Sequence, residues 1–311
     1  MMLMSFTTMS SAMNTATPPL TTLYARLASV PLIWGGTFIA GRVVVAHLPP
    51  ATAAVLRFVF AALALLAAVQ VSRGFASMWR LDRRQLLATA LLGATGVLAY
   101  NLLFFQALAL LPAGRASVIV ALNPVVTLLL AAAVLGDRLS PLRWSGAAMA
   151  LAGVWIVVTR GDLSQLAQAL GRGELAMFGA VCAWAGYTLI GRTMLRGVPP
   201  LVATAWAALW GVLFLVPVAA LERGEVRAAD ITAGTLAGLV FLGVLGTAVA
   251  FVWYSEGVQR LGSARAVVFN NLVPVAGVAL GWVLLGEPVG ASALVGGSLA
   301  VAGVFVVNRA G

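Results

Sequence analysis

The chain has 311 residues, of which 62% are hydrophobic and 9% are charged, and its formal net charge is +10. Soluble globular domains are roughly half apolar and about a quarter charged, so no soluble fold could bury this composition. All 19 basic residues are arginine. Because most of them lie in short connections between apolar segments, they indicate orientation in a membrane rather than a nucleic-acid surface.

The first 23 residues are rich in Ser, Thr and Met, contain no basic residue and end shortly after Pro18-Pro19. They lack the charged start of a cleaved signal peptide, so we expect 1–23 to be a disordered cytoplasmic tail. The single cysteine, Cys182, lies within an apolar segment and cannot form an internal disulfide.

After this tail, apolar segments of about 20 residues, long enough to cross roughly 30 Å of hydrocarbon, follow one another along the chain. Such continuous segments exclude an outer-membrane barrel, whose strands alternate in hydrophobicity. We therefore predict an all-α polytopic membrane protein with ten transmembrane helices. The predicted helices are 24–46, 51–73, 85–109, 114–135, 141–159, 174–195, 200–221, 234–258, 263–285 and 289–307.

The arginines are distributed unequally between the two sides of this predicted topology. With a cytoplasmic N-terminus, twelve arginines lie on the cytoplasmic side and six on the other. Cytoplasmic connections carry the excess of basic residues, so both termini are predicted to be cytoplasmic in a bacterial inner membrane.

A fixed offset of 150 residues relates the two halves of the sequence without gaps. Five helices per half force the second copy to enter the membrane in the opposite orientation, so 24–160 and 174–307 are predicted to be inverted five-helix repeats. Secondary transporters use this architecture, with the solute site near the midplane. A duplicated bundle without a transport role is the alternative. Matches include Trp34 and Trp184, Arg42 and Arg192, Pro49-Pro50 and Pro199-Pro200, Pro124 and Pro274, and Leu135-Gly136 and Leu285-Gly286.

These residues carry a family resemblance across both halves. The sequence Trp-Gly-Gly-Thr-Phe at 34–38, Leu-Arg-Phe at 56–58, Asn123-Pro124, and Leu-Gly-Glu at 285–287 resemble the EamA family of the drug/metabolite transporter superfamily. Gly136-Asp137 stands where that family usually has Gly-Glu. Within the family, the chain is similar to the YddG-type exporters of aromatic and other neutral amino acids. The resemblance implies export of small metabolites, amino acids among them.

Several chemistries have no residues to support them. The chain contains no lysine, so it cannot form a phosphate-binding loop that requires one. The single histidine, His47, has no cysteine or carboxylate cluster around it, and no acidic pair could hold Mg²⁺. We therefore predict no metal, no cofactor and no enzymatic activity.

Two aromatic stripes related by the repeat are predicted to meet near the membrane centre. Trp34 and Thr37 share a face of the first helix, and Trp184 and Tyr187 share the matching face of the sixth. They are candidates for contacting the apolar part of a substrate. The alternative is packing against lipid or a neighbouring helix.

Polar residues in four further helices are candidates for the same cavity. An Asn amide in hydrocarbon must find partners, so Asn123 and Asn270 either face a cavity or join helices together. Asn271 is a weaker candidate because it points about 100° away from Asn270. Residues that could extend the lining are Tyr100, Asn101, Gln106, Trp253 and Tyr254, of which we choose Tyr100, Asn101 and Trp253 as candidates.

Pro124 and Pro274 are predicted to lie in mid-helix, where proline removes one backbone hydrogen bond and kinks the helix. Such a kink is either static or the hinge of a gate, and we favour the hinge because the two prolines are repeat mates.

Among the charged residues within the predicted spans, we single out Arg57 and Glu256, neither of which lies at the midplane. We expect Arg57 to reach the interface or cap backbone carbonyls, and Glu256 to face cytoplasmic water beside Arg260. A proton-coupled cycle normally needs a titratable group at midplane depth. The absence of such a group from the predicted midplane predicts facilitated transport.

The sequence therefore predicts an alternating-access exporter of small neutral or amphipathic metabolites, with membrane lipid and a small-molecule substrate as its partners and no nucleic acid. The alternatives are a proton-coupled exporter of drugs or other metabolites, a channel or scramblase, a membrane enzyme, and a structural protein. Glycines on the predicted helices 141–159 and 289–307 predict that these two helices serve packing or self-association into a homodimer.

Overall fold

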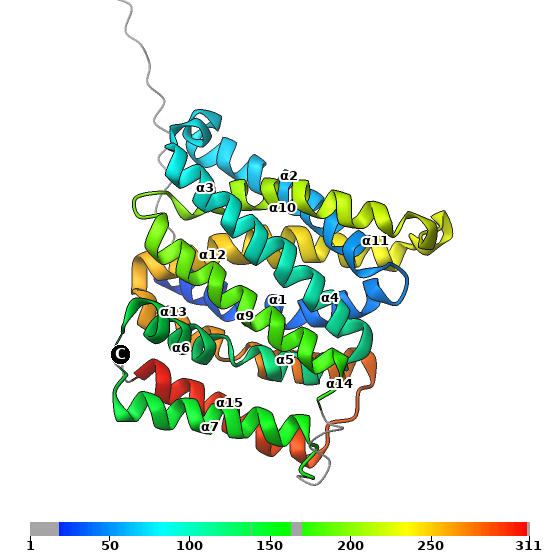
Figure 1. Cartoon of the computed structure of the whole chain (residues 1–311), viewed down its shortest axis with the longest axis vertical. Coiled ribbons are helices and arrows are strands. Elements are labelled where there is room, and N and C mark those ends of the chain that lie inside the picture. The colour runs from blue at the N-terminus through cyan, green and yellow to red at the C-terminus, as the bar shows by residue number, and fades with distance from the viewer. Residues whose placement is uncertain (1–18, 138, 163–169, 310–311) are drawn as a thin grey trace, which may run out of the picture.

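The computed structural model describes residues 19–137, 139–162 and 170–309, and within these ranges it contains helices and no strands. Ten helical segments in the described residues are long and apolar enough to cross a membrane, which agrees with the ten predicted helices. The segments lie side by side as one bundle (Figure 1). The chain is thus an all-α polytopic membrane protein.

The helices of the first half are α1 (Leu20–Val45), α2 (Pro50–Arg73), α3 (Arg83–Leu92), α4 (Tyr100–Leu110), α5 (Ala113–Val120), α6 (Asn123–Leu135) and α7 (Pro141–Val158). Those of the second half are α9 (Arg172–Met194), α10 (Pro200–Leu221), α11 (Ala233–Val240), α12 (Ala250–Leu261), α13 (Ser263–Asn270), α14 (Val273–Leu285) and α15 (Ala291–Arg309). Two π-helical segments, η2 (Gly93–Ala99) and η6 (Phe241–Val249), join α3 to α4 and α11 to α12 within single spans.

The first helix begins earlier than the sequence predicts. Residues 20–23, which we assigned to the disordered tail, form the first turn of α1. Pro19 precedes the helix, where its missing N–H leaves no backbone bond unmade. The remainder of the predicted tail, residues 1–18, lies outside the described residues.

The offset of 150 residues also relates the bounds of the helices. Helices α5 and α6 map onto α13 and α14 at both ends, and the first residue of α2, Pro50, maps onto the first residue of α10, Pro200. Because the number of spans is even, α1 begins and α15 ends at the same face of the bundle, which we call the terminus face. The other end, where α1 ends and α15 begins, is the opposite face.

The structure corrects the expectation that Pro124 and Pro274 kink continuous helices. Each span is instead broken into two half-helices, with turns at 121–122 and 271–272, and each proline lies in the first turn of the second half. A proline there removes no helical hydrogen bond. The Ser117 hydroxyl donates to the carbonyl of Pro274 at 3.3 Å, so the first broken span contacts the second.

The predicted glycine faces of the fifth and tenth spans meet each other within the chain. A Cβ atom on Gly146 would lie 2.8 Å from the Gly303 oxygen, and one on Gly296 would lie 2.5 Å from the Gly153 oxygen. Helices α7 and α15 therefore approach backbone to backbone, and they lie together at one edge of the bundle (Figure 1).

This contact predicts the effect of adding one methyl group. Gly153→Ala should lower the midpoint of thermal unfolding in detergent, because its Cβ atom would overlap the backbone of Ala300. The expected cost is about 1–3 kcal/mol of unfolding free energy. The control is Gly191→Ala in α9, where a Cβ atom meets nothing within 4 Å. Equal midpoints for the two variants would contradict the tight packing.

Candidate binding cavity

A cavity of about 630 Å³ lies between the two repeats. This volume is in the range of small-molecule sites, roughly 300–1,000 Å³. It extends from mid-bundle to the terminus face, where Asp137, Arg143 and Arg192 line its mouth. Of the nine residues predicted to bind substrate, those that line it are Trp34, Thr37, Tyr100, Asn123, Trp184 and Asn270.

The two tryptophans related by the repeat meet through a third ring. Trp34 of α1 and Trp184 of α9 each contact Phe251 of α12, with ring centroids 6.0 Å and 6.2 Å apart. The indole N–H of Trp34 donates to the Gly246 carbonyl at 3.0 Å, which fixes the ring against η6. Phe251 is not among the residues predicted from the sequence, although it is the repeat mate of Asn101 and lines the cavity.

Tyr100 lines the cavity, and its ring lies 5.3 Å from that of Trp184. Tyr187 stacks on Trp184 at 5.0 Å but is not a lining residue. It packs instead over Gly96 of η2, where a Cβ atom would overlap the tyrosine ring. Tyr187 therefore supports the aromatic wall from behind.

Helix α12 presents Tyr254 rather than Trp253 to the cavity. The Tyr254 ring lies 5.4 Å from Trp34. Trp253 contacts the guanidinium of Arg26, which lies 6.0 Å from its ring centroid. Thr37 lines the cavity, but its hydroxyl donates to the Trp34 carbonyl at 2.6 Å, so that hydroxyl hydrogen is already used.

Arg57 is buried in the structure, which corrects the expectation that it snorkels or caps backbone carbonyls. It is 8% exposed and lines the cavity. It donates to the Asn101 Oδ1 atom at 2.9 Å and to the Thr247 hydroxyl at 3.3 Å. A buried guanidinium can remain inside the bundle only where polar atoms replace water, and these two side chains supply them.

The partners of Arg57 belong to the two π-helical spans. The Asn101 amide nitrogen donates to the carbonyls of Gly96 and Val97 in η2. The Thr247 hydroxyl donates to the Leu242 carbonyl in η6 at 2.9 Å. Asn101 is 1% exposed and does not line the cavity. Its position is behind Arg57, not in the wall.

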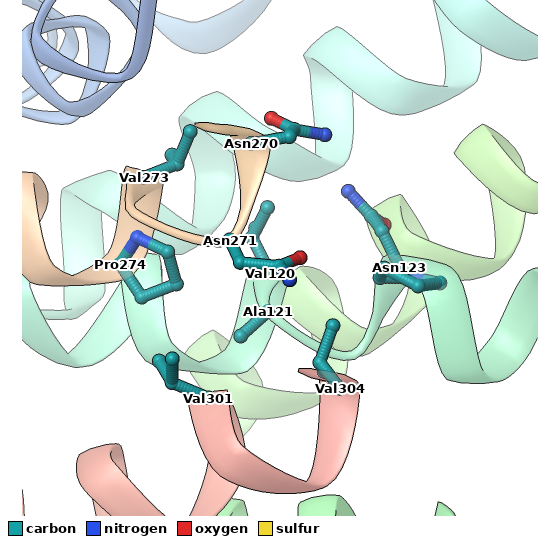
Figure 2. A pocket seen from close by; sticks show the side chains of 10 residues that line it. Val120, Ala121, Asn123, Asn270, Asn271, Val273, Pro274, Val301 and Val304 are labelled. Carbon is teal, nitrogen blue, oxygen red and sulfur yellow. The ribbon is translucent and has the colours of Figure 1, made fainter. Parts of the chain in front are cut away.

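Asn123 and Asn270 both line the cavity where the two broken spans cross. Figure 2 shows them on the side of the breaks away from Val301 and Val304 of α15. The Oδ1 atom of Asn123 is buried and has no hydrogen-bond partner among the described residues. Asn271, the weaker candidate, accepts a bond from Asn308 at 3.2 Å and lines a small adjoining pocket, which shares Asn123 and Asn270 with the cavity.

The cavity does not contain Glu256. This carboxylate pairs with Arg26 at 2.7 Å and with Arg260, four residues along α12, at 3.6 Å. The contact with Arg260 is the one that the sequence predicts. The one carboxylate lining the cavity in the described residues is Asp137, at the mouth, where it pairs with Arg192 at 3.1 Å.

At the opposite face, a carboxylate joins several helices. The two Glu287 oxygens accept from the backbone amides of Ala113 and Gly114 at the start of α5, at 2.7 and 2.9 Å. Arg42 lies 3.7 Å from the same carboxylate and donates to the Leu108 and Leu111 carbonyls at the end of α4. The repeat mates of Arg42 and Glu287 are Arg192 and Asp137, the pair at the cavity mouth.

Comparison with known proteins places this architecture in a family. The EamA-like transporter family model matches residues 6–159 and 171–309. The uncharacterized transporter YyaM of Bacillus subtilis is 26% identical over 92% of this chain and 93% of its own length. A probable terminal-alkyne amino-acid exporter of Streptantibioticus cattleyicolor is 31% identical, covering 78% and 80%. A probable amino-acid metabolite efflux pump of Salmonella typhimurium is 27% identical, covering 89% and 91%. The chain belongs to the EamA-like transporter family and is a multi-pass membrane transporter.

Proposed function

We propose that this transporter exports small neutral or amphipathic metabolites, including amino acids with apolar or aromatic side chains. The observation that carries the proposal is the cavity between the repeats, with aromatic walls and polar groups at its deep end. Trp34, Trp184 and Tyr100 would contact the apolar part of a solute. The side-chain amide of Asn123, which lines the cavity, would bind a polar end.

The names of two relatives agree with this substrate class. One is a probable terminal-alkyne amino-acid exporter and another a probable amino-acid metabolite efflux pump. Amino acids with uncharged side chains are net-neutral zwitterions, and their side chains vary in polarity. A cavity with aromatic walls and few charged groups suits such solutes.

Alternating access is the proposed mechanism, with both termini in the cytoplasm of a bacterial inner membrane. The cavity mouth at the terminus face would then be open to the cytoplasm. The contacts of Glu287 with α5 and with Arg42 at the opposite face would close the periplasmic end. In an inverted repeat, one repeat can adopt the arrangement of the other, which would exchange the closed face for the open one. Pro124 and Pro274, beside the helix breaks, would act as the hinges.

The proposed transport is facilitated, without an obligatory co-ion. Coupling to protons requires a titratable group that is exposed alternately to each side. The deep part of the cavity is lined by no carboxylate or histidine among the described residues, and Asp137 lies at the mouth in an ion pair. High internal solute concentration would then drive net export.

Cysteine labelling tests the proposed orientation of the cavity. In a Cys182→Ala background, Thr188→Cys places a thiol on the cavity lining. A membrane-impermeant maleimide should label it from the cytoplasmic side. Leu213→Cys, on the outer surface of α10, is the control and should react little, because a thiolate does not form in hydrocarbon. Labelling of Thr188→Cys from the periplasm alone would reverse the orientation.

Flux measurements in proteoliposomes test the coupling. Initial uptake of labelled L-phenylalanine should be the same, within about twofold, with and without an imposed pH gradient, because no cavity group at depth exchanges a proton. Unlabelled solute inside should accelerate uptake, as a carrier requires and a channel does not. Accumulation above the external concentration that a protonophore abolishes would favour the proton-coupled alternative.

Removal of one charge at the opposite face should shift the population of states. Glu287→Gln weakens charge-assisted bonds to α5 worth about 1.5–3 kcal/mol, so the closed opposite face becomes less stable. We expect at least a several-fold slower labelling of Thr188→Cys from the terminus face. Glu225→Gln removes an exposed carboxylate of the same face and is the matched control. Equal labelling rates in the two variants would argue against this gate.

A further inference from the structure

We propose that Arg57 binds the carboxylate group of the transported solute, so that the cavity selects monocarboxylates and zwitterions over the corresponding esters and amines. This inference rests on the proposed function for the identity of the solute, and on the geometry of Arg57 for the group that is recognised.

Arg57 is a buried cation without a counter-ion among the described residues. Arg57 takes part in none of the ion pairs in the described part of the chain. No carboxylate of the described residues lies within 4 Å of the Arg57 guanidinium. The side chain also lies over the rings of Phe58 and Phe104, at 5.4 and 6.0 Å. Removing a charge from water costs free energy unless the charge is paired. The two rings and the neutral side chains of Asn101 and Thr247 offset only part of that cost. An anionic ligand would offset the remainder.

The guanidinium is oriented but not saturated. It has five N–H groups, of which one bonds to Asn101 and another to Thr247, while Nε is buried and has no partner in the described part of the chain. Asn101 and Thr247 are themselves held by carbonyls of the two π-helical segments. The planar group is therefore fixed before a ligand arrives, which favours the bidentate geometry of a carboxylate.

The repeat indicates that the fold itself does not require this cluster. The repeat mates of Arg57, Asn101 and Thr247 are Ala207, Phe251 and Val97, all apolar. The same two π-helical spans thus pack in the other repeat position without a buried charge. A cluster needed only to connect helices would be expected in both copies. Its presence on the cavity side of one copy alone favours a role toward a ligand.

The charge around the cavity agrees with an anionic group on the solute. The cavity is lined by three guanidinium groups, those of Arg57, Arg143 and Arg192, and by a single carboxylate among the described residues, that of Asp137. The half-helix α6 also begins at the cavity wall with Asn123, and the start of a helix carries partial positive charge. The side-chain amide of Asn123 lines the cavity and would contact the ammonium group of a zwitterion.

The experiment compares ligands that differ only at the charged groups. Proteoliposome uptake of labelled L-phenylalanine is competed with L-phenylalanine, its methyl ester, 2-phenylethylamine, 3-phenylpropionate and phenyl phosphate. The same ligands are added to purified protein in detergent, and the shift in thermal midpoint reports binding without transport. The variants are Arg57→Gln, Arg57→Lys and Thr247→Val. Arg73→Gln, an exposed arginine at the end of the same helix, is the control.

In Arg57→Gln, the half-inhibiting concentration of L-phenylalanine should rise by about tenfold to a hundredfold, as expected for lost charge-assisted bonds. That of the methyl ester should change by less than about threefold. Arg57→Lys and Thr247→Val should give intermediate losses confined to the carboxylates, and Arg73→Gln should behave as wild type. Should Arg57→Gln not fold, the selectivity ratios of the other two variants provide the test.

Equal weakening of acid and ester in the Arg57 variants would overturn the inference, since a purely structural role affects all ligands alike. Binding of phenyl phosphate to wild type more than about tenfold tighter than 3-phenylpropionate would overturn the choice of carboxylate.

The failure of the inference can be distinguished from the failure of the proposed function. Suppose that wild type does not transport L-phenylalanine, and that 3-phenylpropionate stabilises wild type but does not stabilise Arg57→Gln. The inference then stands and the proposed amino-acid function fails. If L-phenylalanine is transported but the acid-to-ester ratio is unchanged in the variants, the proposed function stands and the inference fails.

Discussion

The need to satisfy every backbone polar group within hydrocarbon determines where this cavity lies. Regular helices satisfy this need by themselves, so irregular backbone at membrane depth is tolerated only where protein groups or a cavity serve it. The described chain has four such places, the segments η2 and η6 and the breaks at 121–122 and 271–272. Asn101 and Thr247 bond to carbonyls of the two π-helical segments, and Ser117 bonds to the carbonyl of Pro274. Residues that flank both breaks line the cavity, as does Gly246 of η6, so the irregular backbone lies next to the cavity.

The repeat explains the positions of the aromatic walls of the cavity, and departures from the repeat explain its polar side chains. Trp34 and Trp184 occupy equivalent positions and contact Phe251 from two sides, so the aromatic walls follow the symmetry. The polar side chains in the deep part of the cavity do not follow the symmetry. Asn123 has the mate Val273, and Asn270 has the mate Val120. Two equivalent halves would offer a solute two equivalent faces, whereas this arrangement can distinguish the two ends of an asymmetric molecule.

The sequence was sufficient to predict the ten spans and the repeat, because hydropathy and a gapless offset report the membrane and the duplication directly. It was insufficient where the helix departs from 3.6 residues per turn. A π-helical segment widens the turn, so side chains beyond it rotate by up to about 100° relative to a regular helix. Tyr100 and Asn101 follow η2, and Trp253 and Tyr254 follow η6, so helical spacing could not decide which of each pair faces the cavity. Burial of Arg57 was missed for a related reason, since its partners belong to these same spans.

The two repeat-related ion pairs suggest why the terminus face is the open one in this structure. Glu287 is one methylene longer than its mate Asp137, and it reaches both amides at the start of α5 while contacting Arg42. Its side chain is 14% exposed, whereas Asp137 is 37% exposed and Arg192 is 59% exposed. Exposed ion pairs contribute little to stability, and charge-assisted bonds to partly buried groups contribute more.

The same contact formed by Asp137 would therefore stabilise a closed terminus face less, unless closure excluded water equally well from that face. A difference of about 1.4 kcal/mol between the two closures would already give a tenfold preference for one state. Under the proposed orientation, that preference leaves the cavity open to the cytoplasm, where an exporter collects its solute.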